Sequence, residues 1–143
     1  MPLARQALHE SGEHVHVAVW PTVREAHQLA SRHYAFEGRC FVLAAGLVMR
    51  ARDLPAELDV PPDIAASPDG LLLRGGSAII GPDGAYVVEP VYDREAILAA
   101  ELDPSAIDRE VFTLDVTGHY SRPDVFDLTV NRSRRAEYRD EPE

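Results

Sequence analysis

The sequence predicts one α/β domain with a mixed β-sheet. Helical and strand-like patterns alternate through the first third of the chain, and a turn signal between two later strand-like segments indicates a β-hairpin. Hydrophobic residues make up 45% of the 143 residues, which is enough to build a single core. The sequence contains no internal repeat, so we expect one layered domain.

The first helix is predicted at the start of the chain. Residues 2–12 (PLARQALHESG) carry an apolar stripe at helical spacing, with Pro2 in the first turn and Gly12 as the C-terminal cap. No capping residue precedes this helix. We therefore expect that part of the fold lies upstream and that this chain holds one half of it.

A strand and a second helix follow. Valines alternate with other residues through residues 14–20, which is the period of a strand, and Pro21 ends the pattern. Thr22 and Glu25 form a capping-box pattern. This pattern predicts a second helix that starts there and ends at Gly38.

The middle of the chain is predicted to contain a buried strand, a long loop and a β-hairpin. Residues 40–49 (CFVLAAGLVM) form a continuous apolar run, which predicts a strand buried on both faces. Residues 50–70 are rich in proline and acidic residues and predict a long loop. Residues 71–80 hold two strand-like stretches around a glycine pair, GPDG at 81–84 predicts a turn, and residues 85–91 predict the return strand.

The last part of the chain is predicted to be mostly extended. Residues 96–103 are a further strand candidate, and a cap followed by a first-turn proline predicts a short helix over 105–112. Residues 113–132 predict an extended arm, so the domain is expected to span 1–132. Residues 133–143 predict a charged, disordered tail.

Composition excludes several classes of protein. The formal net charge is -10 and is spread along the chain, which disfavours nucleic acid as a partner. The longest apolar run, residues 41–49, is too short to span a membrane, and the N-terminus lacks the apolar core of a signal peptide. A single cysteine forms no internal disulfide. We therefore expect a cytoplasmic protein.

Cys40 raises the question of nucleophilic catalysis. In a continuous helix it would share a face with His33 and Glu37, and a thiol, an imidazole and a carboxylate are the groups of a cysteine hydrolase. However, Cys40 follows the C-terminal end of the predicted helix, where the helix dipole disfavours a thiolate. The break at Gly38 also spoils the alignment, so we predict a structural core cysteine.

The sequence predicts neither a metal ion nor a cofactor. The six histidines are dispersed and match no zinc-binding spacing. The glycine-rich stretch at residues 74–84 lacks the ending of a phosphate-binding loop, and no helix follows it.

Four blocks resemble the nitrilase branch of the carbon-nitrogen hydrolases and occur in the family's order. They are residues 1–21 (MPLARQALHESGEHVHVAVWP), 31–46 (SRHYAFEGRCFVLAAG), 74–84 (RGGSAIIGPDG) and 118–128 (GHYSRPDVFDL). The first block resembles the stretch immediately after the family's nucleophile motif. The chain is therefore similar to the C-terminal part of a nitrilase, from Met1 to about Arg132.

The resemblance implies both a fold and a reaction. It implies the C-terminal half of an α-β-β-α sandwich, in dimers or larger oligomers. It also implies hydrolysis of a nitrile or amide by a cysteine thiolate with a glutamate and a lysine, without a cofactor. In the family these three residues precede the first block. All 14 basic residues of this chain are arginine, so no catalytic residue can be assigned in it.

The resemblance also implies roles for five residues. Trp20 and Pro21 match the end of a strand beside the substrate pocket, although core packing is an alternative for Trp20. Arg5, His9 and Arg24 lie on helices that pack against a second subunit in the family.

Two functions remain open at this point. The chain is either the C-terminal part of a nitrilase that is inactive alone, or a non-catalytic module for oligomerisation or complementation. In the first case a small nitrile or amide becomes its substrate when an N-terminal half completes it.

Overall fold

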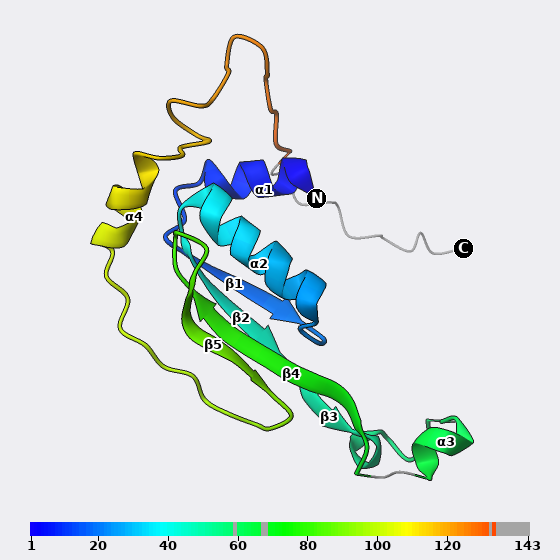
Figure 1. Ribbon diagram of the computed structural model, residues 1–143. Helices are drawn as coiled ribbons and strands as arrows, with labels where there is room; N and C mark the ends of the chain where they lie inside the picture. Colours follow the sequence, from blue (N-terminus) through cyan, green and yellow to red (C-terminus); the bar gives the residue numbers. More distant parts are fainter. Residues whose placement is uncertain (59, 67–68, 132, 134–143) are drawn as a thin grey trace, which may run out of the picture.

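The computed structural model describes residues 1–58, 60–66, 69–131 and 133 (Figure 1). Its elements are α1 (Pro2–His9), β1 (Val15–Trp20), α2 (Glu25–Gly38), β2 (Phe41–Gly46), β3 (Val48–Arg50), the 3-10 turn η1 (Ala51–Asp53), α3 (Pro62–Ala65), β4 (Leu71–Ile80), β5 (Tyr86–Tyr92) and α4 (Ser105–Val111). The tail predicted at 133–143 lies outside the described residues, except for Ser133.

The five strands form one mixed sheet, as predicted. β1 pairs in parallel with β2, whereas β2, β3 and β5 all pair antiparallel with β4. Ile80 of β4 pairs with both Val42 and Tyr86, so β5 lies on the opposite side of β4 from β2. Among the described residues, β1, β3 and β5 each pair with one strand only, so they form the edges of the sheet.

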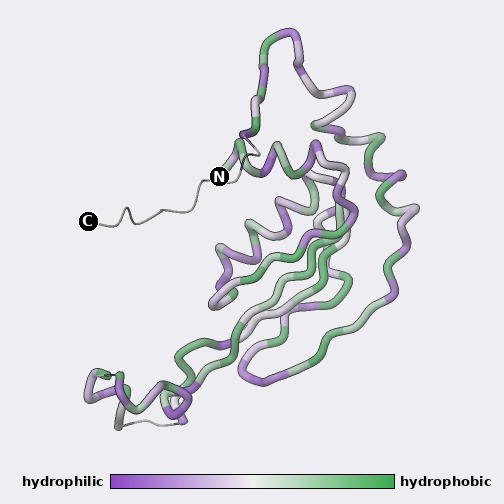
Figure 2. The backbone as a smooth tube through the Cα atoms, turned by 180° about the vertical axis from the view of Figure 1, so that it is seen from behind, coloured by the Kyte–Doolittle hydropathy of each residue, from purple (hydrophilic) through white to green (hydrophobic). Residues whose placement is uncertain are grey.

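One face of the sheet is covered by α2, which lies along the strands (Figure 1). The core under this helix consists of Ala35, Cys40, Val42 and Ile80. The opposite face is apolar but open. Side chains alternate along β1, and Val15, Val17 and Val19 point away from α2 with 44%, 60% and 76% of their surface exposed. Figure 2 shows the hydrophobic stretches that follow the strands.

The predicted capping box of the second helix is wrong. α2 begins at Glu25 with Arg24 as its N-cap, and Thr22 lies outside the helix. The reason is a long-range contact, since the backbone N–H of Val23 donates to the Gly75 carbonyl oxygen (3.0 Å). This bond holds the residues before α2 on β4 and delays the start of the helix.

The apolar run at 40–49 is two strands rather than one, and it is not buried on both faces. β2 and β3 are separated at Leu47, whose carbonyl oxygen accepts a hydrogen bond from the Gly75 N–H (3.0 Å). Ala45 is exposed and Leu43 is half-buried, because the face opposite α2 is open. Residues 71–80, by contrast, form one continuous strand.

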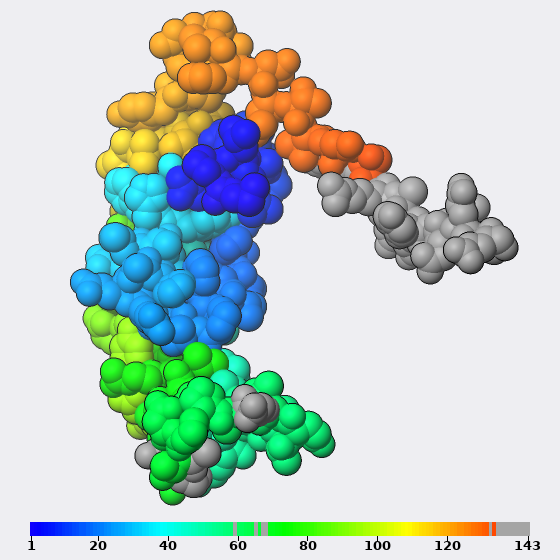
Figure 3. Space-filling model, turned by 90° about the vertical axis from the view of Figure 1, so that its right-hand side faces the viewer, coloured from blue at the N-terminus to red at the C-terminus, as the bar shows by residue number. Residues whose placement is uncertain are grey.

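Two further predictions differ from the structure. Residues 96–103 adopt no regular structure, and Ile97 is 99% exposed. The predicted loop at 50–70 contains η1 and α3. Figure 3 shows this loop projecting from the end of the fold opposite the extended arm that follows α4.

Candidate functional site

The predicted pocket residues lie where β1 ends. The indole N–H of Trp20 donates a hydrogen bond to Ser31 Oγ (3.2 Å), and its ring meets His27 edge-on with centroids 4.8 Å apart. The indole therefore lies against α2, on the covered face of the sheet. Pro21 follows it and is exposed. A role of either residue in binding substrate stays a prediction.

The loop after Trp20 is fixed by a socket for Val23, which is 1% exposed. Gly46 and Gly76 line this socket. A Cβ atom at either position would lie 2.7 Å from an atom of Val23, so only glycine leaves enough room. Gly76 also has a φ of +93°, a left-handed conformation that favours glycine. The irregular part of β4 thus positions the end of β1.

Gln28 connects the same loop to the hairpin. Its amide nitrogen donates to the Gly76 carbonyl oxygen (2.7 Å) and to Tyr92 Oη (3.3 Å), and its amide oxygen accepts from the Tyr86 hydroxyl (3.1 Å). Sequence reasoning missed this residue. The available signal was its spacing, because Gln28 shares the inner face of α2 with Ser31 and Ala35.

Two of the predicted interface residues, Arg5 and His9, lie on α1, and the third, Arg24, is the N-cap of α2. The Arg5 Nε lies 2.6 Å from Glu37 Oε2, and His9 reaches the same carboxylate from the next turn of α1. His9 is 5% exposed, so its contacts are within the chain. Arg24 is exposed at the opposite end of α2. Contact of these residues with a second subunit stays a prediction.

A cluster of polar side chains fills the junction of α1, α2 and β1. We define the His9 cluster as His9, Glu13, His16, Tyr34 and Glu37. The Tyr34 hydroxyl donates to Glu13, and the His16 ring stacks on Tyr34 with centroids 4.0 Å apart. Burial raises the pKa of Tyr34, and the hydrogen bond to Glu13 adds to the effect. The cluster was missed because its members come from separate parts of the sequence.

Cys40 is a core residue, as predicted. It is 0% exposed, and burial raises the pKa of its thiol to about 12, with a smaller contribution from Glu13. His33 is exposed, and its Nδ1 lies 4.0 Å from Glu37 Oε2. The thiol, imidazole and carboxylate do not form a catalytic arrangement.

The described part of the chain offers neither a metal site nor a membrane-spanning helix. Residues 1–58, 60–66, 69–131 and 133 contain no group of three or more histidine, cysteine or acidic side chains that could hold a metal ion. The helices described by the structure include none that is long and apolar enough to cross a membrane.

Comparisons with known proteins agree on one family. Residues 1–109 match the family described as carbon-nitrogen hydrolase. A bifunctional nitrilase/nitrile hydratase of Lupinus angustifolius is 41% identical over 137 residues, which cover 91% of this chain and 38% of the relative. An aliphatic nitrilase of Sinorhizobium fredii is 40% identical over 136 residues, which cover 95% of this chain and 44% of that protein. This chain therefore spans about two fifths of the length of these relatives.

A solved structure supports the fold alone. The carbon-nitrogen hydrolase from Helicobacter pylori superposes with a TM-score of 0.57 at 18% identity, over 79% of this chain and 40% of that one.

Proposed function

Because this chain belongs to the carbon-nitrogen hydrolase family, we propose that it is the C-terminal part of a nitrilase-type hydrolase. The complete enzyme would hydrolyse the carbon–nitrogen bond of a nitrile or an amide. The relatives that support this proposal are themselves named as nitrilases. A cytoplasmic location accords with the single cysteine, which forms no internal disulfide.

In this proposal the chain supplies the frame of the active site rather than its reacting groups. It contains no lysine, and its one cysteine is buried with a raised pKa. The cysteine, glutamate and lysine of the family would therefore come from an N-terminal half. Trp20 and Pro21 would line the substrate pocket, and the isolated chain would be inactive.

The observation that carries the proposal is the open apolar face of the sheet. Val15, Val17 and Val19 line it on β1, and Leu43 and Ala45 continue it on β2 by register. An apolar sheet face stabilises a fold when a second sheet packs about 10 Å away. We propose that the N-terminal half provides that sheet and completes an α-β-β-α sandwich.

Complementation tests this proposal directly. The chain is co-expressed with the N-terminal half of the Sinorhizobium fredii nitrilase, ending where the aligned region begins, and ammonia release is measured from aliphatic and aromatic nitriles. We expect activity from the pair and none from either half. The control is the same half with its nucleophilic cysteine changed to alanine. Ammonia release by the pure chain would contradict the assignment of the triad to the other half.

The same open face favours a second candidate function, a non-catalytic module for oligomerisation or complementation. Among the described residues β1 is an edge strand, and an exposed apolar edge promotes pairing with another chain. This candidate predicts a homo-oligomer, or a complex with the N-terminal half, that releases no ammonia. Light scattering on the chain alone and on the mixture shows whether a complex forms, and ammonia release by the mixture separates the two candidates. A monomer that binds no partner would count against this second function.

A further inference from the structure

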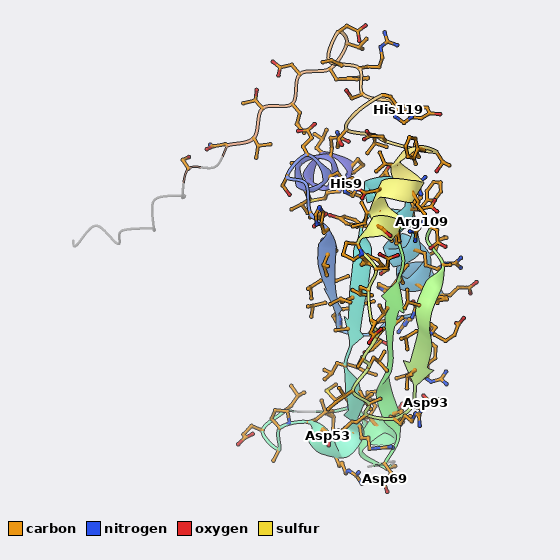
Figure 4. The ribbon with its side chains drawn as sticks, turned by 90° about the vertical axis from the view of Figure 1, so that its left-hand side faces the viewer. His9, Asp53, Asp69, Asp93, Arg109 and His119 are labelled. Atoms are coloured by element: carbon orange, nitrogen blue, oxygen red, sulfur yellow. The ribbon has the colours of Figure 1, made fainter. Side chains whose placement is uncertain are left out.

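Residues 96–103 (AILAAELD) follow the course of a strand without forming one. The structure has no helix, turn or bend between Glu95 and Asp103. In Figure 4, Asp93 just after β5 and Arg109 on α4 lie toward opposite ends of the sheet. The chain between them therefore runs along the length of the strands, as a strand of a neighbouring layer would.

The backbone of this segment is not used in the sheet described above. Within the described part of the chain, residues 95–102 neither donate nor accept a backbone-to-backbone hydrogen bond. The segment contains no proline, so each of its residues has an N–H that can donate. An extended segment of this length with unpaired backbone groups is suited to accept another strand as its neighbour.

The segment lies on the face of the sheet opposite α2. At one end, Ala96 lines the same hollow as Ser77 of β4. At the other end, Glu101 lines a hollow with Phe41 of β2. Phe41 belongs to the face opposite α2 because it pairs in register with Val15, which points away from that helix.

Burial on this face differs from one strand to the next. Phe41 of β2 is 5% exposed, and Ile79 of β4, which pairs with Leu43, is 7% exposed. On β1, by contrast, Val17 and Val19 are 60% and 76% exposed. The segment and α4 thus lie over the part of the face formed by β2 and β4, and the part formed by β1 stays open.

The side chains of the segment are apolar on both sides. Leu98 and Leu102 share one side of an extended chain and are half-buried. Ile97 points to the other side and is 99% exposed. Apolar residues on both sides are typical of a strand that is covered on both faces. In this chain only the inner side is covered.

We propose that residues 96–103 are a strand of the second sheet and pair through their backbone with a strand of the N-terminal half. The proposal rests on the proposed function, in which that half supplies the second sheet. The inner leucines would then belong to the core between the two sheets. Ile97 would be covered by the outer layer of the sandwich.

The family match favours the N-terminal half as the partner over a second copy of this chain. The match covers residues 1–109, so the segment lies within the family's domain. The chain spans about two fifths of the length of its relatives, so most of their length remains to supply a strand. Two copies of the chain, each with a net charge of -10, would also repel each other.

Hydrogen exchange tests the pairing without an assay of activity. Exchange is measured for the amides of residues 96–102 in the chain alone and in its complex with the N-terminal half of the Sinorhizobium fredii nitrilase. We expect fast exchange in the chain alone, because these amides lack backbone partners among the described residues. In the complex, we expect at least tenfold slower exchange at alternate amides of the segment, since alternate N–H groups point to the same edge of a strand.

Two proline variants show which edge of the segment is paired. Ala99→Pro and Ala100→Pro each remove one N–H, and the two N–H groups point to opposite edges. We expect at least one variant to bind the N-terminal half about tenfold or more weakly, because a ladder hydrogen bond is lost and its acceptor is left unpaired. Urea denaturation of the isolated variants should match the natural chain.

The control is Thr129→Pro, which changes an exposed residue outside the family match. Among the described residues the Thr129 N–H has no backbone partner, so this variant should bind the N-terminal half normally.

The outcomes separate this proposal from the proposed function. If a complex forms but residues 96–102 exchange as fast as before, or both alanine variants bind normally, the segment is not a strand of the second sheet and the proposed function stands. If the natural chain forms no complex, both are overturned. Protection that appears in the chain alone and increases with its concentration would assign the segment to a second copy and overturn the pairing with the N-terminal half.

Discussion

Cys40 shows how the surroundings of a single residue determine its chemistry. A thiol with a free cysteine's pKa reacts readily, but Cys40 is enclosed by Ala35, Val42 and Ile80. Because burial raises its pKa to about 12, its thiolate is much scarcer at neutral pH than that of a free thiol. The residue therefore stabilises the core and does not act as a nucleophile.

Iodoacetamide is expected to leave Cys40 unmodified in the folded chain at pH 7, because the thiolate is scarce and the side chain is inaccessible. Mass spectrometry measures the extent of labelling. The same chain in urea is the control and should be labelled at the rate of a free thiol. Rapid labelling of the folded chain would contradict the core assignment.

Gly76 is expected to tolerate no side chain. In Gly76→Ala the new carbon would lie 2.7 Å from the Val23 carbonyl oxygen, at a φ of +93°. We expect the free energy of unfolding to fall by more than about 3 kcal/mol. Gly12→Ala is the matched control because Gly12 also has a positive φ but has open space around it, so its cost should be about 1 kcal/mol. Urea denaturation measures both, and equal losses would refute the socket.

The role of a single residue could be predicted from the sequence where it depends on residues that are close to it along the chain. The position of Cys40 after a helix can be read from neighbouring residues, whereas the predicted cap at Gly12 is wrong because α1 ends at His9 with Glu10 as its C-cap. Gln28 and His9 could not be interpreted in this way, because their partners lie on other elements. A buried polar residue becomes recognisable only when the residues that surround it are known.

Arg39, at the C-terminal end of α2, connects this helix to two other parts of the fold. Its side chain is 4% exposed, and it donates to the carbonyl oxygens of Leu114 and Pro82 (both 3.0 Å) and to Thr113 Oγ1 (2.9 Å). It also lies 3.5 Å from Glu110 Oε2. One guanidinium therefore connects α2, the β4–β5 hairpin and the segment around the end of α4.

Arg39→Ala should lower the free energy of unfolding by about 3 kcal/mol, because several buried acceptors lose their donor. Arg39→Lys should not restore stability, since an ammonium cannot reproduce the planar fork of donors. Arg109→Ala removes an exposed arginine paired with Asp103 and is expected to leave stability unchanged. Thermal and urea denaturation measure the three variants. Equal losses in Arg39→Ala and Arg109→Ala would show that Arg39 does not join these elements.

Helices and strands were predicted well where the signal lies within the segment itself. The first helix, β1, the hairpin and the short helix at 105–111 follow from spacing, turn residues and caps. The start of α2 was misplaced because a hydrogen bond to Gly75 holds Val23 away from the helix. Residues 96–103 have strand-like composition but form no strand in the structure, which shows that composition alone does not provide a pairing partner.

For the whole molecule, the main feature is an apolar sheet face on a strongly acidic chain. The net charge of -10 opposes self-association, whereas the open face with Val17 and Val19 favours it. The sequence predicted the family from four blocks in order, and the family match and the relatives confirm it. The sequence did not predict which side of β1 is open, because both sets of alternating side chains include apolar residues.

Val17→Asp is expected to abolish assembly without unfolding the chain. Val17 is 60% exposed, so a carboxylate there remains hydrated in the isolated chain but would be desolvated when another sheet packs on β1. Light scattering should show loss of self-association and of binding to the N-terminal half, and urea denaturation should show little change. Val130→Asp, which changes a partly exposed valine outside the sheet, is the control and should assemble normally. If Val17→Asp assembles as well as the natural chain, the open face is not the docking surface, and both proposed functions lose the observation that supports them.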